Sequence, residues 1–187
     1  MNLTTRDCQG DKTGNCNVVN FNMVNFSGNF GTISIGEGTY NEEDIVVNTN
    51  VTISGAGNTT IFDGDYTDRL MTIVSSNVTI NNMYIKQYAE PSGNSNTNGG
   101  GALRIGGIAD GSTTEYSTAY TGISVSGITF EDNYCNASSG DGGAVEVVKT
   151  NNASTEIDVN FTNCIFFGNK SGTSTSGNSS YNGGAVK

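Results

Sequence analysis

A pattern of alternating apolar and polar positions recurs four times along the chain and predicts its basic structural unit. Each copy reads apolar, polar, apolar, polar, and then glycine or asparagine. The alternation has the period of a β-strand with one buried face, and glycine and asparagine enter the left-handed backbone region at least cost. We therefore expect each copy to be a short strand that ends in a sharp bend. The copies are Val51–Gly55, Val78–Asn82, Ile123–Gly127 and Val159–Asn163.

A second apolar pair follows each copy, so the predicted unit is strand, corner, strand. In the last two copies the pairs are Ile128 with Phe130 and Ile165 with Phe166. A unit this small cannot bury its apolar face alone, but stacked units can, as in repeat proteins. The copies start at uneven intervals, which fits fixed strands joined by loops of variable length.

Composition favours a narrow stacked core over a compact two-layer domain. Only 34% of the 187 residues are hydrophobic, against about 45–50% apolar residues in an average globular domain. The chain has 26 glycines, one proline and no histidine or tryptophan. We expect an all-β repeat region over residues 31–187, preceded by an irregular lead-in or partial repeat over residues 1–30.

The formal net charge of −10 argues against a nucleic-acid backbone or an anionic membrane surface as partner, because both are polyanions. Solubility is the plain explanation of this charge. No apolar run approaches the roughly 18 residues of a transmembrane helix, and no secretory signal is visible at Met1. The chain reads as a piece of a longer repeat protein, since it ends one strand into a new repeat.

The four cysteines suggest one disulfide at most. Cys8 and Cys16 lie close enough in the sequence to close a small loop in an oxidising setting. Cys135 and Cys164 fall at different places in their repeats, so we expect no bridge between them and interpret them as small apolar groups. Without histidine or a C-x-x-C pair, a zinc site is improbable.

Two stretches resemble a known superfamily. The string Gly38–Val47, which begins with a Gly-Thr-Tyr turn and an acidic run, precedes Val51–Gly64, which reads VTISGAGNTTIFDG. Together they resemble the opening coils of the pectin-lyase-like right-handed parallel β-helix superfamily. That superfamily contains both enzymes and adhesins, so the resemblance implies a fold and leaves the function open.

From residue 100 onward, two motifs alternate in a more specific way. Alternating GGA(I/L/V) and FxxN strings are similar to those of the chlamydial polymorphic membrane proteins and of adhesin-like surface proteins of archaea and other microbes. This resemblance implies a right-handed parallel β-helix of about five coils, cut from a longer one. The motif residues are Gly100, Gly101, Ala102, Phe130, Asn133, Gly142, Gly143, Ala144, Phe166, Asn169, Gly183, Gly184 and Ala185.

The motifs also make physical sense by themselves. Paired glycines allow a tight turn with positive φ, the phenylalanine fills the core, and the asparagine bonds to backbone or to a neighbouring repeat as a ladder. The residue after each inward Leu or Val points outward. If these repeats stack in register, Arg104, Glu146 and Lys187 form a column of alternating charge on the surface.

Candidate chemistry is sparse. Without histidine, and with eight Lys plus Arg, we find no arrangement typical of a polysaccharide lyase or hydrolase, and we expect no catalytic residue and no cofactor. Asp63, Asp65 and Asp68 could bind calcium, although a solvated turn is the more ordinary interpretation. The loops Tyr134–Asp141 and Lys170–Asn182 leave each repeat at the same place, and such insertions form either a binding face or a solubilising loop.

The leading hypothesis is a non-enzymatic, surface-exposed segment, adhesin-like or passenger-like, that contacts a receptor or glycan on a host or neighbouring cell. We expect it at the cell surface or outside the cell, associated with an outer membrane or cell wall, without inserting into the membrane itself. The alternative is a fragment of a pectin-lyase-type carbohydrate-active enzyme. A structural spacer without any ligand is the third possibility.

Overall fold

The computed structural model describes residues 31–90, 99–107, 119–135, 142–148, 156–172 and 184–187. Over these ranges the protein is all-β, with fourteen strands and no helix. The expected lead-in over residues 1–30 lies outside the described residues. The strands are β1 (Thr32–Ser34), β2 (Gly38–Tyr40), β3 (Ile45–Val47), β4 (Val51–Ser54), β5 (Thr60–Asp63), β6 (Met71–Ile73), β7 (Val78–Lys86), β8 (Leu103–Gly106), β9 (Tyr120–Glu131), β10 (Tyr134–Cys135), β11 (Val145–Val148), β12 (Ile157–Thr162), β13 (Ile165–Phe167) and β14 (Lys170–Ser171).

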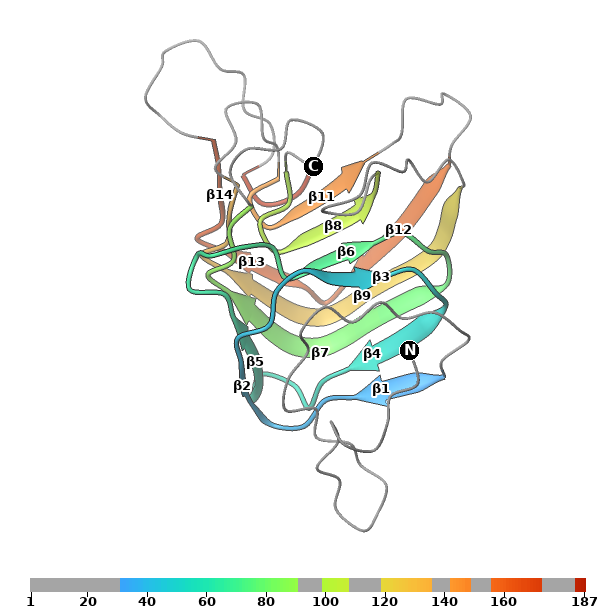
Figure 1. Ribbon diagram of the computed structural model, residues 1–187, viewed down its shortest axis with the longest axis horizontal. Coiled ribbons are helices and arrows are strands. Elements are labelled where there is room, and N and C mark those ends of the chain that lie inside the picture. The colour runs from blue at the N-terminus through green and yellow to red at the C-terminus, as the bar shows by residue number, and fades with distance from the viewer. Residues whose placement is uncertain (1–30, 91–98, 108–118, 136–141, 149–155, 173–183) are drawn as a thin grey trace.

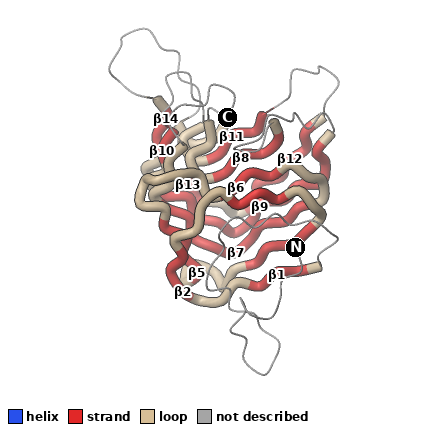
Figure 2. The backbone as a smooth tube through the Cα atoms, viewed as in Figure 1, coloured by secondary structure: helices blue, strands red, loops and turns tan. Residues whose placement is uncertain are grey.

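Parallel pairing joins these strands into three sheets (Figure 1). The largest contains β1, β4, β7, β9 and β12 along one half, and β2, β5, β7, β9 and β13 along the other. The second sheet has the order β3, β6, β8, β11, and β10 pairs with β14 in a small third sheet. In every sheet the strands follow one another in chain order. Within the described residues, successive parts of the chain therefore add strands to the sheets in turn, five to each half of the largest sheet and four to the second, and the connections run at the edges (Figure 2).

The register confirms the repeated five-residue pattern. Val51 pairs with Val78, and Ile80 with Val125, while Val159 pairs with Ile123. All four copies are thus aligned position by position. The strand that alternation predicts at residues 31–36 is β1, and it lies in register with these copies, since its central residue, Ile33, pairs with Ile53. It is not itself a copy of the five-residue pattern, because Gly31 stands at the first position and Ile35 at the fifth.

The predicted bend is left-handed at three of the four corners. φ is 56° at Asn82, 60° at Gly127 and 53° at Asn163. Gly55 was expected to behave likewise but does not, because its repeat turns two residues later, at Gly57, where φ is 94°. Gly55 is needed for space instead: a Cβ there would lie 2.2 Å from the carbonyl oxygen of Asn82.

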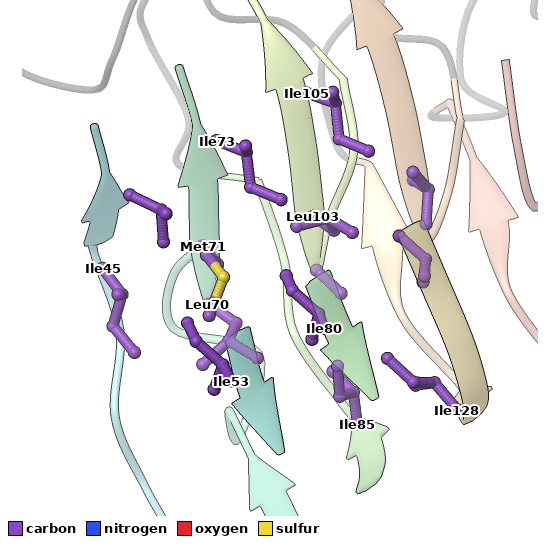
Figure 3. Packing of buried hydrophobic residues seen from close by; sticks show 14 of the residues in the cluster. Ile45, Ile53, Leu70, Met71, Ile73, Ile80, Ile85, Leu103, Ile105 and Ile128 are labelled. Carbon is purple, nitrogen blue, oxygen red and sulfur yellow. The ribbon is translucent and has the colours of Figure 1, made fainter. Parts of the chain in front are cut away.

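The inward side chains of the two larger sheets share one hydrophobic core (Figure 3). It consists mainly of Ile, Val, Leu and Met, which stack strand upon strand across the repeats. The rings of Phe130 and Phe166 stack at 5.0 Å between centroids, with an angle of 4° between their planes. The FxxN phenylalanines therefore face the core, as predicted.

The apolar pair assigned to the last repeat is corrected by the structure. Ile165 is 60% exposed and Phe167 is 63% exposed, while Phe166 between them points inward. Cys164 packs against the core at the position that corresponds to Ile128. Strand alternation therefore places Cys164 and Phe166 inside, rather than Ile165 and Phe166.

Two further observations complete the fold. The stretch Gly38–Tyr40, expected as a turn, forms β2, because Gly38 pairs with Thr60 and Tyr40 with Phe62. Among the described residues, no helix has the length and hydrophobicity needed to cross a membrane.

Candidate functional site

The asparagines of the FxxN motifs form a hydrogen-bonded ladder. Nδ2 of Asn133 donates to Oδ1 of Asn169 (2.9 Å) and to the carbonyl oxygen of Ile85 (3.2 Å). Oδ1 of Asn133 accepts from the backbone N–H of Tyr88 (3.0 Å), and Nδ2 of Asn169 donates to the carbonyl oxygen of Phe130 (2.9 Å). The ladder predicted at this position is therefore present, and it ties three successive repeats together.

Tyr88 starts this ladder at the position where the next two repeats have asparagine. It follows Ile85 by three residues, as Asn133 follows Phe130. Its side chain is fully buried, and its hydroxyl donates to the carbonyl oxygen of Glu42 at 2.7 Å. Burial raises the pKa of Tyr88 well above its usual value. The tyrosine therefore acts as a neutral hydrogen-bond donor, and the FxxN motif does not detect it.

The corner next to the ladder is left-handed in three successive repeats. φ is 57° at Gln87, 49° at Asp132 and 65° at Gly168. The N–H of Asp132 donates to the carbonyl oxygen of Phe167 at 2.9 Å. A Cβ on Gly168 would lie only 2.1 Å from Oδ1 of Asp132. Gly168 therefore adopts the required backbone conformation and also leaves room for the Asp132 carboxylate.

A groove of about 540 Å³ lies along this corner, which is within the range of roughly 300–1,000 Å³ found for small-molecule sites. The hydroxyl of Tyr134 donates to the carbonyl oxygen of Gly172 at 3.4 Å, across part of the groove. The lining combines two tyrosines, a carboxylate, an ammonium group and small residues. It consists of Tyr66, Asp132, Asn133, Tyr134, Gly168, Lys170, Ser171 and Gly172.

Tyr66 has a backbone conformation that bulky residues rarely adopt. Its φ is 58°, after 47° at Asp65, and its N–H donates to the carbonyl oxygen of Gln87 at 2.6 Å. A left-handed conformation costs a residue of this size about 1–2 kcal/mol. The side chain is 48% exposed, so core packing does not account for a tyrosine here. Backbone strain of this kind concentrates at functional sites.

The groove lies where the two long loops start. Tyr134 pairs with Lys170, and Cys135 with Ser171, in the small sheet of β10 and β14. The loops Tyr134–Asp141 and Lys170–Asn182 thus leave from adjacent positions, as the sequence predicts for their first residues. Residues 136–141 and 173–182 lie outside the described residues.

A buried group of charges surrounds the GGA turns, and it corrects the predicted surface column. Arg104 pairs with Glu146 in register, and its Nε lies 3.8 Å from Oε2 of Glu146. The N–H of Lys187 donates to the carbonyl oxygen of Val145, which continues the column. The predicted register is therefore confirmed. The predicted surface location is wrong for Arg104 and Glu146, which are buried, whereas Lys187 is exposed.

The chain on either side of β8 covers these two side chains. A Cβ on Gly99 would lie 2.3 Å from the carboxylate carbon of Glu146, and one on Gly107 would lie 3.0 Å from Nη2 of Arg104. The fully buried Arg69 holds this segment in place: its Nε donates to the carbonyl oxygen of Gly100 (2.8 Å) and its Nη2 to that of Gly99 (2.9 Å).

This arrangement perturbs the pKa of Glu146. Burial raises its pKa to about 7, against the opposing effects of Arg104 and Arg69, and buried Glu90 raises it further. Glu90 also accepts a hydrogen bond from Sγ of Cys135 at 3.3 Å. These charges lie inside the protein, where a polymeric substrate does not reach them, so we interpret the group as structural.

The GGA glycines have two different roles. Gly100 and Gly142 have φ values of 66° and 70°, as predicted for the turn. Gly101 and Gly143 are required for close packing, since a Cβ on either would lie within 2.5 Å of a carbonyl oxygen of the next repeat. Ala102 and Ala144 are fully buried behind them. In the last repeat, Gly184 and Ala185 are described and Gly183 is not.

The three aspartates proposed for calcium are used separately. Oδ2 of Asp63 lies 2.7 Å from Nζ of Lys86, and Oδ1 of Asp68 accepts from the N–H of Arg69 at 2.7 Å. Asp65 occupies the left-handed turn before Tyr66. Within the described ranges, no group of three or more Cys, Asp or Glu side chains is arranged to hold a metal ion.

The cysteines behave largely as expected where the structure describes them. No disulfide joins Cys135 to Cys164; Cys135 is buried and Cys164 is half-buried. Cys8 and Cys16, the proposed disulfide, lie outside the described residues.

Sequence reasoning missed the groove and the burial of the charges. Tyr66 and Tyr134 carry no motif. They line the same groove because the turn that contains Tyr66 is bonded to the corner at Gln87 in the next repeat. For Tyr88 the one usable signal is its spacing: it follows Ile85 by three residues, as asparagine follows phenylalanine in FxxN, although the residue types differ. Comparison of the chain with family models, curated proteins and solved structures finds no match.

Proposed function

We propose that this chain is a segment of a right-handed parallel β-helix displayed at a cell surface, where it contacts a receptor or glycan of a host or neighbouring cell without catalysis. Strands that follow chain order in every parallel sheet support the β-helix. Crossovers between parallel strands of one sheet are right-handed in about 98% of cases, which supports the hand. The alternating GGA and FxxN motifs support the adhesin-like interpretation.

The groove at the FxxN corner is the observation that carries the contact function. It combines an exposed tyrosine in a strained conformation with Asp132 and Lys170, at the start of two long loops. Binding surfaces of repeat proteins often form where insertions leave one side of the stack. The arginines of the GGA region, in contrast, are buried, which weakens the enzyme alternative.

Binding of the purified chain to fixed cells and to a printed glycan array tests this function. The double variant Tyr66→Ser/Tyr134→Ser should lose most binding. Phe167→Ser is the matched control, because Phe167 is a similarly exposed aromatic residue outside the groove lining. No binding by the unaltered chain to any cell or glycan, or equal loss in the control, would contradict the proposal.

The enzyme alternative is tested separately. Incubation with polygalacturonate and with neutral polysaccharides, followed by measurement of reducing ends and of absorbance from unsaturated products, should give no turnover. Turnover that persists after repurification and is lost in Asp132→Asn would replace the contact function by catalysis.

A further inference from the structure

We propose that the groove at Asp132 recognises an uncharged pyranose unit of a glycan and discriminates against acidic sugars; this inference rests on the contact function proposed above. The groove contains the two elements that sugar recognition needs, an aromatic surface and a fixed hydrogen-bonding group.

Tyr66 and Tyr134 supply the aromatic surface. A tyrosine ring is apolar on its face and polar at its hydroxyl, so it can pack against the C–H face of a pyranose while remaining wet at its edge. Tyr66 is held by the bond from its N–H to the carbonyl oxygen of Gln87, and Tyr134 by β-pairing with Lys170. Both backbones are thus fixed before a ligand arrives, which lowers the entropic cost of binding.

Asp132 supplies the hydrogen-bonding group. Its backbone is held by the bond to Phe167, and its Oδ1 lies directly over Gly168. An ionised carboxylate is an acceptor only and has two oxygens, so it suits two neighbouring hydroxyl groups, which are donors. Hydrogen bonds to a charged acceptor are roughly twice as strong as neutral ones.

The charge of the site sets the discrimination. A uronic-acid carboxylate in the groove would face Asp132 on a chain of net charge −10, and like charges in a partly enclosed site repel. Lys170 is the cation of the lining and is the group that would attract an acidic sugar. The proposal therefore predicts that the repulsion between Asp132 and a uronic-acid carboxylate exceeds the attraction of that carboxylate to Lys170.

Matched sugar pairs test this directly. Methyl galactopyranoside and methyl glucopyranoside are compared with the corresponding uronides, which differ only in a carboxylate at C6, by ligand-observed NMR titration of the full chain. We expect at least one neutral glycoside to bind in the millimolar range, with its uronide about tenfold weaker or more. Asp132→Asn should weaken the neutral sugar several-fold and bring the two members of the pair within about twofold of each other.

Two further variants separate the effect of where the Asp132 carboxylate lies from the effect of the charge on Lys170. Gly168→Asn keeps a residue that tolerates the left-handed conformation but places a Cβ where the Asp132 carboxylate lies, so it should lose neutral-sugar binding like Asp132→Asn while its thermal midpoint by circular dichroism stays close to that of the unaltered chain. Lys170→Gln should weaken binding of the uronide further, because Lys170 is the lining group that would attract its carboxylate.

The outcomes distinguish this inference from the contact function. If the uronide binds more tightly than the matching neutral glycoside, and Lys170→Gln loses that uronide binding, the proposed ligand class is wrong while the contact function stands. If no glycoside binds but the tyrosine variants still lose cell binding, the partner is not a neutral sugar and the inference fails alone. If neither glycosides nor cells bind, both proposals fail. Should Gly168→Asn not fold, Asp132→Asn and the sugar pairs still decide the matter.

Discussion

Replacing Glu146 by glutamine should change how the stability of the protein depends on pH. Burial raises the pKa of Glu146 from 4.5 to about 7, despite Arg104 and Arg69 nearby. In the unfolded chain the carboxyl group returns to its ordinary value. At pH 5–7 the folded state therefore binds more protons than the unfolded state, and stability falls as pH rises through this window.

The expected magnitude follows from the two pKa values. Below pH 4.5 the carboxyl group is neutral in both states, so its contribution to stability is fully present there. Between pH 4.5 and about 7 the free energy of unfolding falls by about 1.4 kcal/mol per pH unit. The total loss above pH 7 is about 3 kcal/mol. Glu146→Gln removes this titration, so the variant should gain about 3 kcal/mol over the unaltered chain between pH 4 and pH 8.

Urea unfolding followed by far-ultraviolet circular dichroism at five pH values measures this difference. The difference in free energy of unfolding between the variant and the unaltered chain at pH 4 contains every other effect of the substitution. The change of this difference with pH isolates the ionisation of Glu146. Glu156→Gln is the control, because Glu156 is exposed, and its curve should run parallel to that of the unaltered chain. If the Glu146→Gln curve also runs parallel, within about 1 kcal/mol, burial of Glu146 does not act as argued.

Three other substitutions test the packing of the repeats and the corner. Gly101→Ala should destabilise the protein by at least about 2 kcal/mol in urea unfolding, because a Cβ would lie within 2.5 Å of carbonyl oxygens of the next repeat; Gly31→Ala, with no atom near its Cβ, is the control, and equal effects would refute the packing role. Asn133→Ala should cost about 2–4 kcal/mol, because it removes the bonds to Asn169, Ile85 and Tyr88 in a buried site; a thermal midpoint unchanged from that of the unaltered chain would show that the ladder contributes little. Tyr66→Asn should stabilise the chain by about 1 kcal/mol, because asparagine tolerates the left-handed conformation, while it reduces binding at the groove; a loss of stability would mean that the tyrosine ring contributes packing that outweighs the strain.

Sequence alone determined the four strands of the five-residue pattern, three of their four corners and the alignment of the repeats. Both signals are local. The alternation of apolar and polar residues in Val51–Ser54 depends only on neighbouring residues along a strand. The ability to adopt a left-handed backbone conformation is a property of the single residue at Asn82, Gly127 or Asn163. The repeated motifs then aligned the repeats, which is why the register of Arg104 with Glu146 and the bonds of Asn133 could be predicted.

The tertiary structure decided which outward-pointing side chains are covered by other parts of the chain and which side chains line the groove. Outward-pointing Arg104 and Glu146 are buried because the chain around Gly99 and Gly107 folds over them, and the alternation within β8 and β11 carries no information about that cover. The groove exists because Tyr66 from one repeat lies next to Asp132 and Tyr134 from a later one. Such contacts depend on the paths of loops between repeats, and those paths have no periodic signal in the sequence.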